Sequence, residues 1–287
     1  MAYEKEWGIV TILVTGATGS VGRLVVDELV ALGAPVRALT VNPEKAALPE
    51  DVDVVTGYLG RPGTLPAALK GVDAVYLAPL PDTVVEFTEL AREAGVGRVV
   101  ALSGSNADEE EREGSSGAHY LKVERAVEAA GFDWTFLRPG VFANNTLGWA
   151  DEIRASGTVS SAYPDAAQTP IDLRDIARVA AKVLTESGHT GRKITLSGPE
   201  SITQAGQVAA IAAALGTEIR FHELTRAEHR QVWLDHGIPG EVADWLLDGF
   251  AEATEHPQVP EPGYRELMGE PGTTYQQWAI DNAGAFR

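Results

Sequence analysis

The sequence predicts an α/β protein, with a doubly wound, mainly parallel sheet and a smaller C-terminal α+β lobe. In the first half, short apolar runs alternate with amphipathic helical patterns, which is typical of βαβ units. A glycine-rich turn joins the first apolar run to the first helix. After about Asn145 the alternation loosens. We therefore expect residues 1–145 to carry the sheet and residues 146–287 to form a substrate lobe with a helical lid, interleaved with the sheet.

The first strand is predicted in "TILVTGATG", a β-branched run that ends in glycine. The next helix is predicted from Ser20 to Leu32, because Val21, Val25 and Leu29 fall on one face and Gly33 provides a stop. Further strands are expected within 35–41, 52–59, 72–80, 96–105 and 132–140, and helices within 83–95 and 124–131. Parallel strands of this kind are covered by helices on both faces.

The second half contains fewer strands and more helices. Residues 170–186 form a helical pattern that begins with Asp residues, and residues 202–216 form another that ends in glycine. Strands are expected within 192–200 and 219–224. Residues 225–237 and 239–256 predict two helices joined by a Gly/Pro turn.

Composition excludes several classes of function. The formal net charge of −18 disfavours binding to nucleic acid or to anionic membranes. The absence of cysteine removes disulfides, thiolate metal sites and cysteine nucleophiles. The six His residues form no convincing ligand set, so no metal is expected. The start of the chain has no apolar signal-peptide core, so we expect a cytoplasmic monomer or homodimer that acts on a small molecule.

The segment "VTGATGSVG" supplies Gly16, Gly19 and Gly22 between a strand and a helix. Such glycines permit a tight turn, a close approach of pyrophosphate and close packing of helix on strand. The helix N-terminus offers free N–H donors to phosphate. We expect this loop to bind a dinucleotide through Gly16, Thr18, Gly19, Ser20, Val21 and Gly22.

The end of the second strand, Thr40, Val41 and Asn42, decides which dinucleotide is bound. No acidic residue is there for a ribose 2′-hydroxyl, and no Arg stands at position 41 for a 2′-phosphate. Arg37 and Lys45 are the nearest cations. NADP(H) is slightly favoured, and NAD(H) stays open.

Eight segments are distributed over almost the whole length of the chain: "ILVTGATGSVGRLVVDEL", "VRALTVNPEKA", "GVDAVYLAPLP", "VGRVVALSGSNAD", "DWTFLRPGVFANN", "PIDLRDIARVAAKVL", "ITLSGPESIT" and "TTYQQWAIDNAGAFR". With these segments the chain resembles the atypical short-chain dehydrogenases of the NmrA-like kind. The resemblance implies a Rossmann-type domain with a small C-terminal lobe. It also implies that Leu77, Ala78 and Pro79 border the adenosine half of the cofactor, and that Ser103, Pro139, Val141 and Phe142 lie along the nicotinamide half. The family includes quinone and ketone reductases as well as nonenzymatic dinucleotide sensors.

Related enzymes protonate the carbonyl oxygen with a Tyr whose pKa is lowered by a Lys four residues later. Here Lys122 lies only two residues after Tyr120, and on a helix such residues point about 200° apart. The position four residues on is Glu124, whose charge would raise a Tyr pKa. In the alternative register, Tyr120 takes the Lys position and Ser116 the Tyr position. Neither register gives the pair.

Ser105 is the best match to the family's catalytic Ser, and Ser103 is the alternative. Tyr120 remains a catalytic candidate, although packing at the lobe is the favoured interpretation. His119 is more simply a surface residue, and residues 108–113 are a charged loop that could also form a flap over the site. Phe142, Asn145, Trp149 and Trp233 are candidate substrate residues, with core packing as the plainer alternative for the aromatic ones.

We expect an NAD(P)H-dependent reductase of a ketone or quinone. Because no Tyr–Lys pair is present, the proton would come from the substrate or from water. A phenol hydrogen-bonded to the ketone could supply it, so an aromatic polyketide ketoreductase of the angucyclinone type is the preferred hypothesis. The alternative is a nonenzymatic NAD(P)-sensing protein that regulates a partner.

Overall fold

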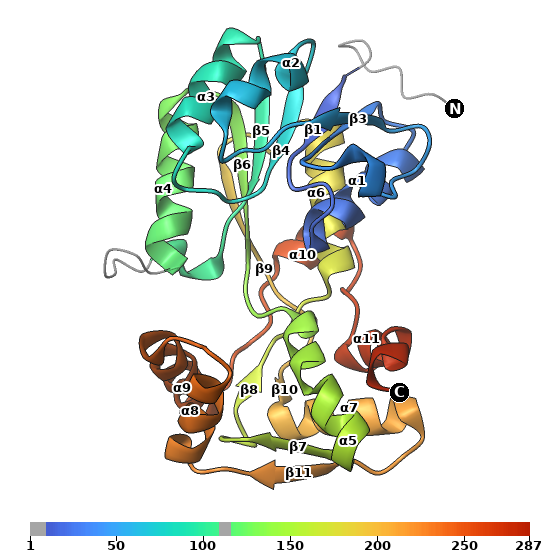
Figure 1. The fold of residues 1–287 in the computed structure, drawn as a ribbon, viewed down its shortest axis with the longest axis vertical. Helices are drawn as coiled ribbons and strands as arrows, with labels where there is room; N and C mark the ends of the chain where they lie inside the picture. Colours follow the sequence, from blue (N-terminus) through green and yellow to red (C-terminus); the bar gives the residue numbers. More distant parts are fainter. Residues whose placement is uncertain (1–9, 109–115) are drawn as a thin grey trace. The chain divides into compact units, whose positions relative to one another are not determined.

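A seven-stranded sheet is the centre of the first of two structural units in the computed structural model, which describes residues 10–108 and 116–287 (Figure 1). The strand order is β3-β2-β1-β4-β5-β6-β9, and every neighbouring pair is parallel. The sheet therefore grows outward in both directions from β1, which confirms the predicted Rossmann-type fold. The strands are β1 (Ile12–Val14), β2 (Val36–Thr40), β3 (Asp53–Thr56), β4 (Ala74–Leu77), β5 (Arg98–Leu102), β6 (Asp133–Pro139) and β9 (Arg192–Leu196).

Helices cover both faces of this sheet (Figure 1). On one face, α1 (Ser20–Ala31) packs against α6 (Leu173–Thr185). On the other face lie α2 (Leu65–Leu69), α3 (Val84–Glu93) and α4 (Ser116–Ala129). Alternate strand residues such as Leu13, Val75 and Val99 pack with Phe87 of α3 and Val127 of α4 in one buried cluster. Three 3₁₀ turns, η1 (Pro43–Lys45), η2 (Pro62–Thr64) and η3 (Ser105–Asp108), connect these elements.

The second unit is smaller and has its own core. β7 (Thr158–Ser161) pairs in parallel with β11 (Arg220–Glu223), and β8 (Ala167–Gln168) pairs antiparallel with β10 (Ile202–Thr203). Its apolar cluster includes Ile153, Val159, Ile211 and Trp278. The helical elements are η4 (Ala143–Trp149), α5 (Ala150–Ser156), α7 (Gln204–Leu215), α8 (Arg226–Asp235), α9 (Gly240–Glu255), α10 (Gly263–Met268), α11 (Tyr275–Asp281) and η5 (Ala283–Phe286).

The chain passes between the two units more than once. Unit 1 consists of Met1–Gly140 and Leu173–Leu196, and unit 2 consists of Val141–Asp172 and Ser197–Arg287. The segment Leu173–Leu196, which the sequence division placed in the lobe, thus packs in the sheet unit. Its α6 buries one apolar face against α1 and the sheet, and its β9 pairs with β6. Within the described residues, no helix is long and apolar enough to cross a membrane.

Candidate functional site

The glycine-rich loop between β1 and α1 is shaped by steric limits at two of its glycines. Gly16 has a φ of +61°, a left-handed conformation that favours glycine. A Cβ on Gly22 would lie 2.2 Å from the carbonyl oxygen of Gly16, so no larger residue fits there. The loop closes through a hydrogen bond from the Gly19 amide to the Gly16 oxygen, at 2.8 Å.

The N-terminus of α1 is open to a ligand. Its N-cap residue is Gly19, and no side chain caps the helix. Thr18, Gly19 and Ser20 are exposed, whereas Val21 is buried and can offer only its backbone. Uncapped amides at a helix N-terminus carry partial positive charge and bind phosphate.

Thr15 fixes this loop to the neighbouring strand, a role that the sequence did not reveal. Its hydroxyl donates to the carbonyl oxygen of Tyr76 at 3.0 Å and accepts from the amide of Ala78 at 2.8 Å. The Thr15 amide donates to the same Tyr76 oxygen at 3.0 Å. These bonds hold the ends of β1 and β4 side by side, as a ligand site at the switch point of the sheet requires.

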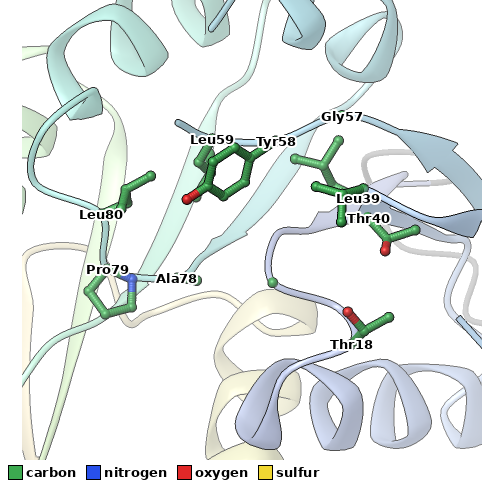
Figure 2. Close-up of a pocket in the computed structure, with 11 residues that line it drawn as sticks. Thr18, Leu39, Thr40, Gly57, Tyr58, Leu59, Ala78, Pro79 and Leu80 are labelled. Atoms are coloured by element: carbon green, nitrogen blue, oxygen red, sulfur yellow. The ribbon is translucent and has the colours of Figure 1, made fainter. Parts of the chain in front are cut away.

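A pocket of about 290 Å³ lies beside this loop, at the carboxyl ends of neighbouring strands (Figure 2). Its volume is at the lower end for ligand pockets, so it suits one part of a dinucleotide. Three predicted groups meet here: the loop, the end of β2 and the segment after β4. The lining residues are Gly16, Thr18, Leu39, Thr40, Val41, Gly57, Tyr58, Leu59, Ala78, Pro79 and Leu80.

The sequence analysis missed the contribution of the segment after β3. Gly57, Tyr58 and Leu59 directly follow that strand, so the rule that ligands bind at the carboxyl ends of parallel strands could have found them. Leu77, in contrast, has its side chain in the apolar core. The next residues, from Ala78, line the pocket instead.

The cations near the end of β2 do not line the pocket. The Arg37 guanidinium is bound elsewhere, to Asp53 at 2.6 Å and to the carbonyl oxygens of Ala68 and Lys70 at 3.0 and 2.8 Å. The Val41 side chain is 67% exposed. None of the lining residues carries a formal charge, and the polar side chains among them are Thr18, Thr40 and Tyr58.

The two candidate serines have different surroundings. Ser103 is buried, and its hydroxyl donates to Oε1 of Glu124 at 2.5 Å. Because a serine has only one O–H donor, Ser103 cannot also donate to a substrate while this bond holds. Ser105 is exposed at the start of η3, and a Cβ on Gly140 would lie 3.9 Å from its Oγ. Ser105 is therefore at the carboxyl edge of the sheet, beside the end of β6.

Glu124 belongs to a buried ion pair. It is fully buried, and Arg138 is 5% exposed. Arg138 binds it through both Nε and Nη2, at 2.8 and 2.6 Å. The other edge of the guanidinium binds Asp108, which holds the pKa of that carboxyl below its ordinary value. With Ser103, which directly follows β5, this network connects α4, β6 and η3.

Among the described residues, burial and not a neighbouring cation sets the environment of the Tyr120 phenol. α4 includes both Tyr120 and Lys122, and Lys122 is exposed. The Tyr120 ring packs on Gly104, where a Cβ would lie 2.5 Å from the ring. Burial raises the pKa of Tyr120 above its ordinary value. The phenol therefore stays protonated and can donate a hydrogen bond, but it is a weaker acid than the Tyr of a Tyr–Lys pair.

The predicted substrate residues belong to unit 2. Phe142 forms an isolated bridge with Ile171, Asn145 is exposed in η4, and Trp149 packs partly against the apolar cluster. On α8, the ring of Trp233 lies 4.1 Å from the ring of His229. Pro139 ends β6, and Val141 begins unit 2. The predicted flap falls largely on residues 109–113, outside the described part of the chain.

The comparisons with known proteins agree with this geometry. A model of an NAD(P)H-binding family matches residues 16–187, more than half of the chain. The chain belongs to this NAD(P)H-binding, NmrA-like family of atypical short-chain dehydrogenases. It is 38% identical over 279 residues to a (4-alkanoyl-5-oxo-2,5-dihydrofuran-3-yl)methyl phosphate reductase of Streptomyces griseus, covering 96% of this chain and 99% of the relative.

Two further relatives are informative. An NAD(P)H azoreductase of Xenophilus azovorans is 33% identical, with 96% of this chain and 99% of the relative covered. A crystal structure of the Escherichia coli NADPH-dependent quinone oxidoreductase QOR2 with NADPH has a TM-score of 0.79 and 25% identity, over 94% of this chain and 99% of the other. From its family and these relatives, the chain described here is an NAD(P)H-dependent oxidoreductase.

Unit 1 fits the dinucleotide that the family binds. A Cβ on Gly19 would crowd the Gly16 oxygen at 3.2 Å, and the exposed glycine leaves its backbone accessible to a phosphate. The uncapped N-terminus of α1 would hold the phosphates, and the pocket behind it would hold the adenosine half. Within the described segments, no group of three or more His, Cys, Asp or Glu residues is arranged to hold a metal ion.

Proposed function

We propose that this oxidoreductase reduces electron-poor, conjugated acceptors such as quinones and unsaturated ketones, without a protein-supplied strong acid. The proposal depends mainly on which residue stands four positions after Tyr120 and on what binds that residue. In the register that takes Tyr120 as the catalytic Tyr, this position holds Glu124 where related enzymes have Lys, and its carboxylate is bound by Arg138 and Ser103. In the alternative register Tyr120 itself takes the Lys position, so neither register gives the pair. Nothing on α4 therefore lowers the Tyr120 pKa.

Conjugated acceptors need less acid catalysis than simple ketones. When bound, NAD(P)H supplies a hydride, and the acceptor is reduced by two electrons and takes up one proton. In a simple ketone the negative charge collects on one oxygen, which becomes a strong base. In a quinone or an unsaturated dicarbonyl it spreads over the conjugated system, so water or a neighbouring phenol on the substrate can provide the proton.

The relatives favour the same class of acceptor. A quinone, an azo compound and an alkanoyl-oxo-dihydrofuran all contain a conjugated, electron-poor double bond. Two relatives above 30% identity are both reductases, which favours a reductase over a regulatory sensor. An aromatic polyketide with a quinone or hydroxyaryl ketone would belong to this acceptor class and remains our candidate for the natural substrate.

Two side chains at the sheet edge are assigned supporting roles. The exposed Ser105 hydroxyl would donate a hydrogen bond to the acceptor oxygen, and the neutral Tyr120 phenol would donate a second. Phe142, Asn145, Trp149 and Trp233, which belong to unit 2, remain proposed substrate residues. Positioning of this kind can lower a barrier by about 7–11 kcal/mol without acid catalysis.

The test is a panel of acceptors followed by oxidation of NADPH and of NADH. We expect turnover of naphthoquinones and of unsaturated ketones, with kcat nearly constant between pH 6 and 8. Matched saturated ketones should be reduced at least about 10²-fold more slowly, since they need the general acid. Equal rates on a saturated ketone and its unsaturated counterpart would contradict the proposal.

A further inference from the structure

Tyr58 is a large aromatic side chain held at the edge of the dinucleotide pocket. It is 47% exposed, whereas Tyr76 of β4 is 1% exposed. Figure 2 shows its ring between the Pro79–Leu80 segment and the end of β2. An exposed ring in this position is available for contact with a ligand.

The backbone around Tyr58 holds this ring in place. The Tyr58 amide donates to Oγ1 of Thr64 at 3.0 Å, and the Arg61 amide donates to the Tyr58 oxygen at 2.9 Å. The Thr64 hydroxyl in turn donates to the Arg61 oxygen at 2.8 Å. The ring lies against Gly60, where a Cβ would come within 2.4 Å of the ring carbon Cε1. The tyrosine is therefore positioned before any ligand binds.

The remaining walls of the pocket around the ring are apolar. Leu39, Leu59, Ala78, Pro79 and Leu80 line it, and its polar Thr18 and Thr40 belong to the phosphate loop and to β2. A purine held by its hydrogen-bonding edge would need amide, carboxylate or free backbone groups at this place. No Asp, Glu, Asn or Gln is among the lining residues.

Much of the local backbone is also occupied by bonds within the protein. The Gly57 amide donates to the Thr40 oxygen at 2.9 Å. The Leu59 oxygen accepts from Oγ1 of Thr83 at 2.8 Å. With both backbone groups of Tyr58 engaged as well, few polar groups are left to read the edge of a base.

We propose that the adenine of the cofactor stacks on Tyr58, and that this pocket recognises the flat face of the base and not its hydrogen-bonding edge. Stacking on an aromatic side chain is tolerant of the base, because every purine has the same kind of face. The enzyme should therefore accept dinucleotides in which another purine replaces adenine. This inference goes beyond the proposed function and does not depend on which acceptor is reduced.

The test measures binding of oxidised dinucleotide by calorimetry, in the absence of any acceptor. Tyr58→Phe should bind NADP⁺ within about 2-fold of the parent, because the stacking face is kept. Tyr58→Ala should bind about 5- to 150-fold more weakly, the range expected for one stacked base. Val85→Ala is the matched control, since Val85 is 51% exposed on α3 and does not line the pocket.

Two further measurements separate stacking from simple loss of bulk or of fold. Tyr58→Leu, which keeps bulk but has no ring, should weaken NADP⁺ binding nearly as much as Tyr58→Ala. The adenine protons of bound NADP⁺ should show ring-current NMR shifts in the parent and in Tyr58→Phe only. The hypoxanthine counterpart of NADP⁺ should bind the parent within about 3-fold of NADP⁺. Unchanged binding by Tyr58→Ala, or a 10-fold or greater loss with hypoxanthine, would overturn the inference.

Discussion

Replacing Arg138 by Met should destabilise the protein strongly, because it leaves the fully buried Glu124 carboxylate without its main partner. Breaking a buried ion pair from one side costs about 3–5 kcal/mol. The Ser103 hydroxyl remains bound to Glu124, and Nζ of Lys193 lies 3.6 Å from it, so the lower half of that range is expected. A loss of about 3 kcal/mol corresponds to a fall in Tm of roughly 6–12 °C for a chain of this size.

The assay is urea unfolding followed by circular dichroism, with Tm measured in parallel. Arg23→Met is the matched control, since Arg23 forms an exposed ion pair with Asp27 that should contribute at most about 1 kcal/mol. The double variant Glu124→Leu/Arg138→Met should recover much of the loss, because no unpaired buried charge remains. A change below about 1 kcal/mol in Arg138→Met alone would refute the reasoning.

Three further predictions concern the cofactor loop, the cofactor preference and pH. Gly22→Ala places a Cβ 2.2 Å from the Gly16 oxygen, so the dinucleotide affinity measured by calorimetry should fall by roughly 10²-fold. Gly249→Ala is the control, because its Cβ would meet nothing within 4 Å, and it should leave the affinity unchanged. Val41→Arg adds a cation at an exposed position that lines the pocket, so the ratio of NADPH affinity to NADH affinity should rise about 10- to 100-fold. An unchanged ratio would show that the 2′ position of the ribose does not lie beside residue 41. Burial lowers the pKa of His229, so the unfolded chain binds more protons below about pH 6.5, and stability measured in urea should fall as the pH drops through that range. The stability of His229→Phe should fall less steeply as the pH drops, and an equally steep fall would contradict the assignment of this pH dependence to His229.

The periodic elements could be predicted from the sequence because their cause is local. The spacing of Val21, Val25 and Leu29 predicts a helix from Ser20 to Leu32, and α1 spans Ser20–Ala31. Likewise the glycine spacing predicts a phosphate loop, and the structure shows the steric reason for Gly16 and Gly22. In both cases neighbouring residues carry the whole signal.

The contacts that decide the chemistry depend on residues far apart in the chain. The sequence shows Glu124 only as the residue four positions after Tyr120, and it is the fold that brings Arg138 and Ser103 to its carboxylate. Arg37 is close in sequence to the end of β2, yet its bonds to Asp53 and to two carbonyl oxygens hold it away from the pocket lining. Tyr58 follows a strand without any glycine motif to draw attention to it.

The measurement that tests the central claim most directly is the turnover of a naphthoquinone by Tyr120→Phe. If the protein supplies no strong acid, only one hydrogen bond is lost, and kcat/KM should fall by less than about 10-fold. Lys122→Met is the matched control and should be unchanged, because Lys122 is exposed on α4. A loss of about 10² or more with Tyr120→Phe, which is what general-acid catalysis contributes, would contradict the account.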